Sequence, residues 1–590
     1  MAVEKLIVDH IDTWTTALQT RSTAGRGSSG KIDLYGIKKL RELILELAVR
    51  GKLVPQDPND EPASVLLERI AAEKAELVKQ GKIKKQKPLP EISEEEKPFE
   101  LPEGWEWTTL NTLAEINPKI DVSNDEQDIS FVPMPLISTK FDGSHDFEVR
   151  KWKEVKKGYT HFANGDIAIA KITPCFENSK AAIFSGLKNN VGVGTTELHV
   201  ARPYSQAVNQ QYLLLNFKSP SFLKTGESQM TGSAGQKRVP RNFFENYPLP
   251  YPPLQEQERI VNNFTQLMIL CDHLEQHSLT SLDAHQQLVE TLLTTLTDSQ
   301  NADELAENWA RISEHFDTLF TTEASIDALK QTILQLAVMG KLVPQDPNDE
   351  PASELLKRIA QEKAQLVKDG KIKKQKPLPL ISDEEIPFEL PEGWKWCLFE
   401  DVVDIQSGIT KGRNLVNRKL ITIPYLRVAN VQRGYLDLSE VKEIDIPEEE
   451  QDKYHVIKGD LLITEGGDWD TVGRTTVWCH EWYIANQNHV FKGRIIGKEI
   501  DPYWLETYMN SPYSRDYFAS ASKQTTNLAS INKTQLRGCP VAIPPSSEAN
   551  KIMLKLNDFN ELCEKLKLQL QSAQQTQLHL ADALTDAAIN

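Results

Sequence analysis

One internal duplication constrains the fold of this chain more than any other feature of the sequence. Residues 51–107 and 340–396 align without a gap, agree at 48 of 57 positions and begin with the same run, GKLVPQDPNDEPAS. The segments that follow the two copies differ from each other. Because one connecting segment precedes two unlike segments, the sequence predicts two halves of the same architecture, each with its own variable domain.

Each copy of the repeat predicts a helix followed by a basic linker. We expect Ser64 and Ser353 to cap this helix, whose apolar residues recur at helical spacing until Gly81 or Gly370 ends it. The linker KIKKQK and then the motif PFELPEGW follow in both copies. A further amphipathic helix is predicted upstream of each copy, so that a helical connector precedes each variable domain.

Two long helices are predicted after the variable domains. Each follows a proline pair, Pro252-Pro253 or Pro544-Pro545, and its apolar residues are spaced by three and four, which favours a coiled coil. We expect the two helices to pair as an antiparallel rod of about 29 residues and about 43 Å. The predicted seam contains Phe264, Leu267, Cys271, Leu274, Ser278, Ser281, His285, Leu288 and Leu292 in the first helix, and Leu556, Phe559, Cys563, Leu566, Leu570, Ala573, Gln577, Leu580 and Leu584 in the second.

The predicted fold class is α+β, with two mixed α/β domains that are separated by long antiparallel coiled-coil helices and related by an internal pseudo-twofold repeat. Short apolar runs such as GDIAIAKI at 165–172 and GDLLIT at 459–464 predict strands in both variable domains. The expected parts are, in chain order, an N-terminal helical connector at 1–107, the first variable domain at 108–253, a spacer helix at 254–300, a second connector at 301–396, the second variable domain at 397–545 and a C-terminal spacer helix at 546–590.

Charge and hydropathy exclude several classes of protein. The formal net charge is −17, but the first variable domain has 16 Lys and Arg against 14 Asp and Glu, and the second has 17 against 20. The acidic excess therefore lies outside the variable domains, so the net charge does not argue against a polyanionic partner for them. The sequence has no run of 18 or more uncharged apolar residues and no signal peptide pattern, and we expect a cytoplasmic protein with no membrane partner.

No catalytic or metal-binding motif in the sequence is complete. GRGSSGKI at 25–32 has Ile32 where a Walker A loop needs Ser or Thr, and VGVGTTE at 191–197 lacks the third glycine of a dinucleotide site. The catalytic tetrapeptides of amino-methyltransferases and the H-E-x-x-H pair do not occur, and six dispersed cysteines form no C-x-x-C pair. We therefore expect a chain that is not an enzyme and binds no metal or cofactor itself.

The order of these parts resembles the specificity (S) subunit of type I restriction-modification systems. Three motifs carry the resemblance: PFELPEGW at 98–105 and 387–394, the GD-I/L-x-I run at 165–169 and 459–463, and the exit segment at 231–261, which is echoed at 525–545. The resemblance implies that each variable domain recognises one half of a split double-stranded DNA target. It also implies that the repeated helical parts bind two methyltransferase (M) subunits, that restriction (R) subunits join the complex, and that S-adenosylmethionine, ATP and Mg bind to those partners.

The exit segment is the main candidate for DNA contact. Its small residues let the backbone approach a duplex closely, while Lys and Arg can bind phosphates, and amide or guanidinium groups can bind base edges. Similar side chains recur in the second variable domain and beside the strand runs. The candidate DNA-binding residues are Gln236, Lys237, Arg238, Arg241, Lys171, Asn178 and Lys180 in the first domain, and Lys411, Arg413, Asn414, Arg427, Asn430, Gln432, Arg433, Arg474, Asn527, Asn532 and Lys533 in the second.

Other interpretations of the same features stay open. The pattern also fits a non-DNA coiled-coil scaffold that joins protein partners through two unlike domains, and the candidate residues also fit solvated charge clusters. The KIKKQK linkers at 82–87 and 371–376 fit a phosphate contact or a solvated linker. Because the variable domains are nearly neutral, we expect this chain alone to bind DNA modestly, with the M subunits supplying much of the positive surface.

Overall fold

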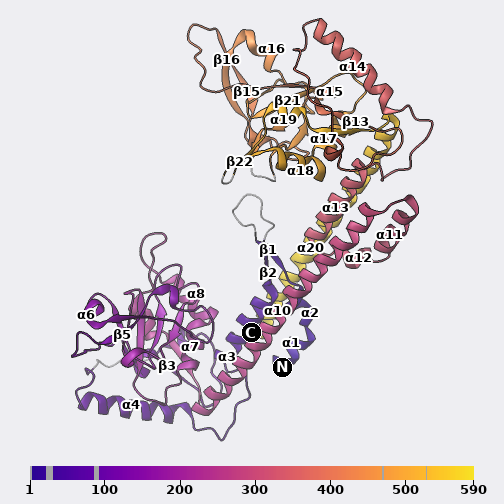
Figure 1. Ribbon diagram of the computed structural model, residues 1–590. Helices are drawn as coiled ribbons and strands as arrows, with labels where there is room; N and C mark the ends of the chain where they lie inside the picture. Colours follow the sequence, from indigo (N-terminus) through magenta and orange to yellow (C-terminus); the bar gives the residue numbers. More distant parts are fainter. Residues whose placement is uncertain (1–2, 22–30, 86–91, 468–470, 526–527, 590) are drawn as a thin grey trace. The chain divides into compact units, whose positions relative to one another are not determined.

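The computed structural model describes residues 3–21, 31–85, 92–467, 471–525 and 528–589 (Figure 1). The chain folds as two compact units. Unit 1 contains the described residues up to 280 and those from 573 onward, and unit 2 contains residues 281–572. None of the helices in the described ranges is both long enough and apolar enough to cross a membrane.

Unit 1 starts with the helical connector that the sequence predicts. Helices α1 (Val3–Asp9), α2 (Ile11–Thr16) and α3 (Tyr35–Val49) precede the first repeat copy, and β1 (Gln19–Arg21) pairs with β2 (Lys31–Asp33) before α3. Helix α4 (Ala63–Lys79) lies inside the copy. Its predicted end is confirmed, because Gly81 has a φ of +70°, a left-handed conformation that favours glycine.

The predicted serine caps are wrong. Helix α4 begins at Ala63 after Pro62, so Ser64 lies inside the first turn and caps nothing. The amide of Ala63 instead donates to the carbonyl oxygen of Gly104 at 2.9 Å, so the PFELPEGW turn supplies an acceptor for the helix start. In the second copy α14 (Ala352–Lys368) repeats the arrangement, with Ser353 inside the helix and Ala352 donating to Gly393 at 2.8 Å.

The first variable domain contains two four-stranded sheets, ordered β6-β5-β10-β7 and β4-β11-β8-β9, and the strand pair β12-β3 that joins its two ends. All four residues of β8 are buried, which agrees with the apolar run that predicts this strand. The elements are β3 (Glu106–Thr109), α5 (Leu110–Leu113), β4 (Ala114–Ile116), β5 (Asp128–Val132), β6 (Glu148–Lys151), α6 (Trp152–Val155), β7 (Thr160–Phe162), β8 (Ile167–Ala170), β9 (Ala181–Ile183), β10 (Gly192–Gly194), β11 (Leu198–Pro203), α7 (Gln210–Lys218), α8 (Pro220–Ser228), α9 (Arg241–Asn246) and β12 (Pro248–Tyr251).

Unit 2 repeats this plan with different side chains. Its connector contains α11 (Ala302–Glu314), α12 (Phe316–Leu319), α13 (Glu323–Val338) and α14, and its sheets are ordered β14-β21-β17-β19, β16-β15-β20, β18-β23-β22 and β13-β24. The elements of the second variable domain are β13 (Lys395–Leu398), α15 (Phe399–Val402), β14 (Val403–Gln406), β15 (Leu420–Leu426), β16 (Lys442–Pro447), α16 (Gln451–Tyr454), β17 (Leu461–Thr464), β18 (Gly466–Gly467), β19 (Thr475–Val477), β20 (Ala485–Asn486), β21 (Val490–Ile495), α17 (Pro502–Met509), α18 (Pro512–Ala521), β22 (Lys523–Thr525), β23 (Leu528–Ser530), α19 (Lys533–Arg537) and β24 (Pro540–Ile543).

One sheet is equivalent in the two variable domains. In β4-β11-β8-β9 and in β14-β21-β17-β19 the two central strands are antiparallel, with Leu198 opposite Ala170 and Val490 opposite Thr464. Each sheet also has a buried aspartate that accepts hydrogen bonds from an arginine on the neighbouring strand. These pairs are Arg202 with Asp166 and Arg494 with Asp460, each with a closest distance of 2.7 Å.

Two long helices, α10 (Leu254–Asp298) and α20 (Ser546–Ile589), begin directly after the proline pairs, as predicted. They contain 45 and 44 residues, so the expected length of about 29 residues is too short. The heptad pattern counts only part of each helix. Outside that part the helices continue with further buried apolar residues, such as Ile260 and Leu296 of α10 and Ile552 of α20.

Contacts within each unit show that the long helices run antiparallel. In unit 1 Arg41 of α3 contacts Asp272 at 2.6 Å, and Gln56, further along the chain, contacts Glu256, so the segment that contains α3 is antiparallel to α10. Tyr35 contacts Asp582 and Lys52 contacts the carbonyl oxygen of Ile589, so the same segment is parallel to α20. In unit 2 the pairs Lys330–Glu564 and Asp327–Lys567 show that α13 runs against α20. His285 contacts Leu319 O and Lys341 donates to Thr297 O, so the chain around α13 runs in the direction of α10.

The buried stripe of each long helix departs from the predicted seam. Phe264, Leu267, Cys271 and Ser278 are buried as expected, but Leu288 is 51% exposed and Val289 is buried instead. On α20 Leu580 is 43% exposed and Ala581 is buried. A straight α-helix drifts by about 20° per heptad from a 3.5-residue repeat, so the buried stripe moves by one residue along a helix of this length. In unit 2 the buried stripe also belongs to one apolar cluster with Ile326, Leu329 and Ile333 of α13, a helix that the two-helix prediction leaves out.

Candidate nucleic-acid interface

The candidate site of the first variable domain lies where β8 ends and β11 begins. The amide of Lys171 donates to the carbonyl oxygen of Glu197 at 2.9 Å, and the amide of Val239 donates to the carbonyl oxygen of Lys171 at 2.8 Å. The exit segment therefore lies beside the two strand ends. We call this backbone arrangement of 171, 197 and 239 the first frame.

The tip of the exit segment is a tight turn that projects polar side chains. Thr231 and Arg238 exchange two backbone hydrogen bonds of 3.0 and 2.8 Å. Gly232 has a φ of +126°, and a Cβ there would meet the carbonyl oxygen of Gln236 at 2.8 Å, so this position requires glycine. Gln236 and Lys237 are exposed, and their side chains make no hydrogen bond or ion pair with other described residues.

Arg238 is held across the first frame by a carboxylate. Its guanidinium donates to both oxygens of Glu197, with a shortest distance of 2.8 Å, and also to the carbonyl oxygen of Gln236. These hydrogen bonds lower the pKa of Glu197. Arg238 is still 41% exposed, so the pair presents a fixed pattern of donors and acceptors to a ligand. Arg241, at the start of α9, is exposed and pairs with Glu245 one helical turn on.

The loop after β8 carries the remaining candidates of this domain. Asn178 is exposed, whereas the Lys180 ammonium donates to the carbonyl oxygen of Met134 at 2.8 Å and so has a structural partner. A buried lysine, Lys218 of α7, donates to Ser179 O at 2.7 Å and Thr139 O at 3.3 Å. Burial lowers the pKa of Lys218 to about 7. Lys218 therefore positions the loop rather than a ligand.

The second variable domain contains the same frame with different side chains. The amide of Glu465 donates to the carbonyl oxygen of His489 at 3.0 Å, and the amide of Ile531 donates to the carbonyl oxygen of Glu465 at 2.9 Å. Glu465 thus takes the place of Lys171, and His489 takes the place of Glu197. Their side chains pair, with 2.5 Å between His489 Nδ1 and a carboxylate oxygen of Glu465. We call the backbone arrangement of 465, 489 and 531 the second frame.

Sequence reasoning missed Glu465, His489 and Glu197. An isolated acid or histidine next to the end of a strand carries no signal by itself. Alignment of the two strand runs, GDIAIAK and GDLLITE, would place Glu465 opposite Lys171 and so identify it as an equivalent position.

Next to the second frame, Asn532 caps α19 by accepting hydrogen bonds from the amides of Thr534 and Gln535. Lys533 is half-buried, and burial lowers its pKa. Asn527 lies outside the described residues. Of these three candidates, the structure therefore describes one residue with a capping role and one lysine that lines a groove with α14.

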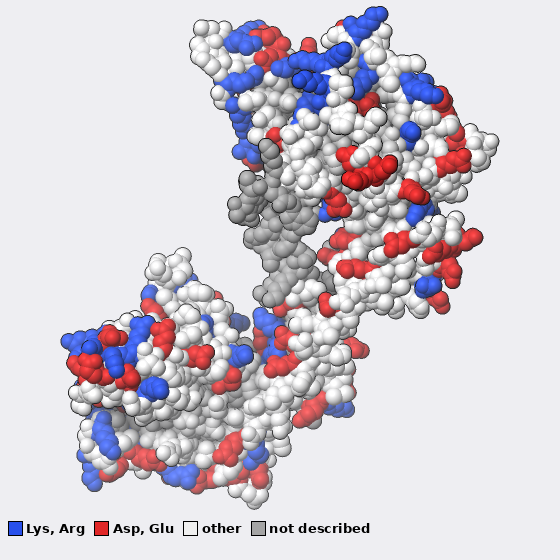
Figure 2. Space-filling model, viewed as in Figure 1, with Lys and Arg blue, Asp and Glu red and all other residues white. Residues whose placement is uncertain are grey.

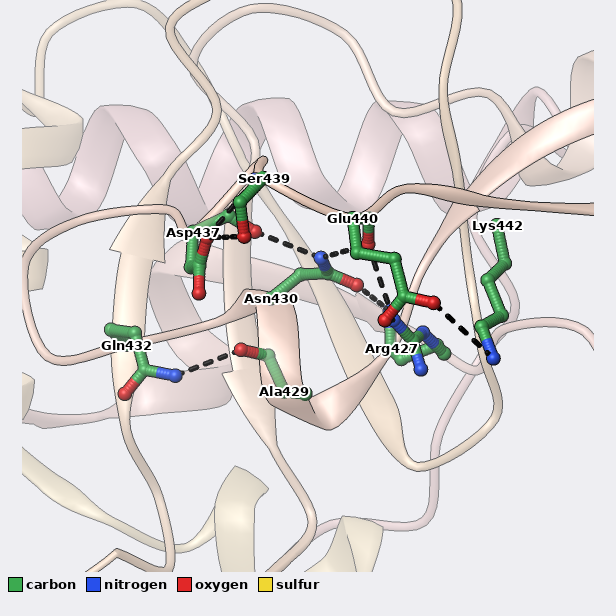
Figure 3. Close-up of polar contacts among 8 residues, drawn as sticks. All are labelled: Arg427, Ala429, Asn430, Gln432, Asp437, Ser439, Glu440 and Lys442. Carbon is green, nitrogen blue, oxygen red and sulfur yellow. Dashed lines mark hydrogen bonds and ion pairs between the residues drawn. The ribbon is translucent and has the colours of Figure 1, made fainter.

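Arg427, Asn430 and Gln432 belong to a loop whose polar groups mostly satisfy one another (Figure 3). The Asn430 side chain is 3% exposed; it accepts from the amide of Arg427 and donates to the carbonyl oxygens of Asp437 and Glu440. Arg427 pairs with the Glu440 carboxylate at 2.9 Å, and Lys442 approaches the same carboxylate. Asn430 therefore shapes the loop, because its side chain has no group left for a ligand.

Gln432 connects this loop to Arg474. Its amide nitrogen donates to Ala429 O and its amide oxygen accepts from Arg474, both at 2.8 Å. Arg433 instead lines a hollow with residues of α13, α17 and α20, so the structure does not bring it to the same place as the second frame.

Lys411, Arg413 and Asn414 form another group, on the loop after β14. The Lys411 ammonium lies 5.1 Å from the ring centre of Tyr425, and Arg413 pairs with Glu450 at 2.7 Å. The Asn414 side chain accepts from the amide of Val416 in its own loop. Lys411 and Asn414 are exposed, and Arg413 is partly buried.

No group of three or more His, Cys, Asp or Glu side chains in the described ranges is placed to hold a metal ion. Lys171, Gln236, Lys237 and Arg238 thus lie with Glu197 at the first frame, and Glu465 and His489 lie at the second, whereas the candidates at 411–414 and 427–433 lie on other loops. Such side chains can bind phosphates and base edges.

Comparison with known families identifies the architecture. The type I restriction modification DNA specificity domain matches residues 102–284 and 391–572, one match in each half of the chain. The chain belongs to this family. Type I specificity subunits recognise the DNA target, and the catalytic activities of their systems lie in other subunits.

Two curated type I specificity subunits match the whole chain. The EcoAI specificity subunit of Escherichia coli is 67% identical over 603 residues, and the EcoEI specificity subunit of Escherichia coli is 64% identical over 596 residues. Both alignments cover 100% of each protein. Among solved structures, the HsdS subunit from Thermoanaerobacter tengcongensis is 17% identical, with 84% of this chain and 98% of that chain covered and a TM-score of 0.41. The chain is a specificity subunit with two recognition domains, which are its variable domains.

Proposed function

We propose that this specificity subunit recognises a bipartite double-stranded DNA target, with one part bound by each variable domain and a gap of constant length between them. The observation that carries the proposal is the pair of equivalent frames. Each frame has the same backbone hydrogen bonds at the end of the same sheet, but the side chains differ in charge and shape. Equal frames with unlike side chains suit two different half-sites in one target.

The residues named below divide into three roles under this proposal. Arg238 with Glu197, and Glu465 with His489, contact base edges, because each pair holds polar groups in a defined geometry at a frame. Lys237, Arg241, Lys171 and Lys411 contact phosphates. Asn430, Lys180 and Asn532 shape their own loops, so they are not part of the proposed DNA-contact surface.

The long helices set the gap in this proposal. An unbroken helix of 45 residues rises by about 67 Å, which exceeds the 34–36 Å of one turn of B-DNA. Both long helices take part in both units, so a change in their length is expected to change the gap and neither half-site.

The wider assembly follows from the same proposal. Two M subunits bind the repeated helical parts, R subunits join them in the cytoplasm, and S-adenosylmethionine, ATP and Mg act on those partners. This chain supplies the target selection.

The experiment that tests this function is a gel shift of the chain with M subunits, on duplexes recovered from the methylated sites of a genome that carries the system. Selective retention of these duplexes over scrambled ones is the expected result. Equal retention of both, or of neither, would instead support a protein scaffold without DNA specificity.

A further inference from the structure

Unit 2 contains a groove whose lining includes one of the candidate DNA-binding residues, Lys533. It has a volume of about 1000 Å³ and lies between α14 with the following linker on one side and β13, α15 and β14 on the other. Two hydrogen bonds link its two sides: the Lys363 ammonium donates to Glu400 O, and the Arg537 guanidinium donates to Lys376 O at 2.7 Å. Helix α14 is anchored on its other side by the buried Leu355 and Ile359.

The α14 wall of the groove is formed by apolar residues, and the side chains in its middle are small. Leu356 and Val367 are half-buried, and Ala360 and Ala364 between them are exposed. These residues recur every three or four positions and form one stripe along the helix. Small side chains in the middle of such a stripe leave room for another backbone, as in grooves that bind amphipathic helices.

The rim of the groove is basic. Among the described residues that line it, nine are Lys or Arg and three are Asp or Glu. Two of the acids are occupied, because Glu400 accepts from Arg537 and Asp401 accepts from the amide of Leu398. The ammonium groups of Lys368, Lys373 and Lys374 are exposed and make no hydrogen bond or ion pair with other described residues. Figure 2 shows Lys and Arg gathered over the end of this unit that carries α14 and α16.

Comparison of the two repeat copies shows which face of the helix has the same residues in α4 and α14. Four positions differ between α4 and α14, and three of them, at Glu354, Gln361 and Gln365 of α14, lie outside the groove lining. On the helix, the groove face differs only at Lys357, which is Glu68 in the first copy; beyond the helix, the groove residue Lys395 is Glu106 in the first copy. Leu67, Ala71, Ala75, Val78, Lys79, Lys84 and Lys85 of the first copy match Leu356, Ala360, Ala364, Val367, Lys368, Lys373 and Lys374.

We propose that the groove along α14, and the equivalent face of α4, dock an acidic amphipathic segment of one protein partner that this chain binds twice. An apolar stripe with a basic rim complements a helix with apolar and acidic faces. A phosphate backbone would use the lysines but would leave the apolar stripe uncovered. The variable domains differ because the half-sites differ, whereas these two faces agree because they bind the same partner.

This inference rests on the proposed function, in which the M subunit is the partner present in two copies. The test uses the full-length chain, the purified M subunit and no DNA, with native mass spectrometry to count bound subunits. The triple variant K368E/K373E/K374E changes the second face, and K79E/K84E/K85E changes the first. The matched control, K368R/K373R/K374R, keeps the charge at the same positions.

We expect the unchanged chain and the arginine control to bind two M subunits, each triple glutamate variant to bind one, and the combined variant to bind none. The affinity of a changed face should fall by about tenfold or more. Two M subunits on the combined variant would overturn this inference and leave the proposed function in place. If the unchanged chain bound no M subunit, the assembly itself would be wrong. If the glutamate variants bound M normally but retained the target duplex more weakly in the gel shift of the proposed function, the groove would be a DNA contact and the inference would be overturned.

Discussion

At the residue scale, the two frames differ most in where their charges lie. Lys171, Glu197 and Arg238 surround the first frame, and Glu465, His489 and Ser530 occupy the equivalent positions of the second. Guanidinium groups donate to guanine and carboxylates accept from cytosine, so these sets are suited to different base edges.

Replacement of Arg238 by alanine should relax recognition of one half-site. Loss of a base-edge contact is expected to reduce discrimination at one position by about 1–3 kcal/mol, because the correct base is then bound without the contact that favoured it over other bases. The measurement is competition binding of the chain–M complex against duplexes that vary at each target position. The matched control is R241A, which removes a proposed phosphate contact and should weaken all duplexes alike. Identical profiles for the two variants would exclude Arg238 as a base contact.

Replacement of Glu465 by glutamine should alter the other half-site. The amide keeps the size of the side chain but replaces one acceptor with a donor, so a base that donates to Glu465 should no longer be preferred. The same competition assay measures the effect. A change at the half-site that Arg238 affects, or no change at all, would refute the equivalence of the two frames.

Protonation of His199 should destabilise the first variable domain in mild acid. Its ring stacks on Phe244, and Nε2 lies 3.1 Å from Val239 O, next to the first frame. Burial lowers its pKa to about 4. The unfolded chain therefore takes up a proton near pH 6.5 while the folded chain does not, so stability from this group is present above pH 6.5 and lost as pH falls toward 4.

Urea titrations of the unchanged chain and H199Q at pH 7 and pH 5 measure this effect. Between pH 7 and pH 5, the unfolding free energy of the unchanged chain should fall by about 2 kcal/mol more than that of H199Q. A difference that does not change with pH would mean that His199 is not held neutral.

At the element scale, the repeat uses glycine for two different reasons. Gly340 and Gly370 have φ values of +71° and +72°, so an alanine is equally strained at both. A Cβ at Gly340 would also meet Pro391 at 2.6 Å and Trp394 at 2.9 Å, whereas a Cβ at Gly370 meets nothing within 4 Å.

The variant G370A should therefore lose about 1 kcal/mol of unfolding free energy, and G340A clearly more, because overlap is added to strain. Thermal or urea unfolding of both variants measures the difference. Equal losses would show that the PFELPEGW turn moves away without cost.

The sequence predicts these elements well where the cause is local. The proline pairs place the starts of α10 and α20, and Gly81 ends the helix before it. The Ser64 cap fails because the acceptor for the first amide, Gly104 O, lies 41 positions away and no local pattern reveals it. The seam fails at Leu288 because its neighbour Val289 packs with α13, a partner that a heptad count does not include.

The same distinction holds for the candidate site. The exit turn at 231–238 is visible in its glycines, and the structure forms it as a turn. The carboxylate partner of Arg238 cannot be recognised in the sequence, because Glu197 is 41 residues away. The two residues meet only because β11 lies next to β8 in the sheet. The amide side chain of Asn430 is of a type that can contact DNA bases, yet its three hydrogen bonds lie inside its own loop.

At the scale of the whole molecule, the chain repeats its connecting parts and varies the parts between them. Near-identical repeat copies, equivalent frames and antiparallel long helices make the two halves interchangeable in architecture. Exchange of one variable domain should therefore change one part of the target without affecting the other part or the gap.

Genome-wide mapping of methylated positions tests this claim most directly, in cells that carry the intact system and in cells whose subunit has residues 108–253 replaced by the matching domain of the EcoEI relative. We expect a two-part motif with a constant gap in the first strain, and a motif with one part replaced and the same gap in the second. A single continuous motif, or a simultaneous change of both parts, would contradict it.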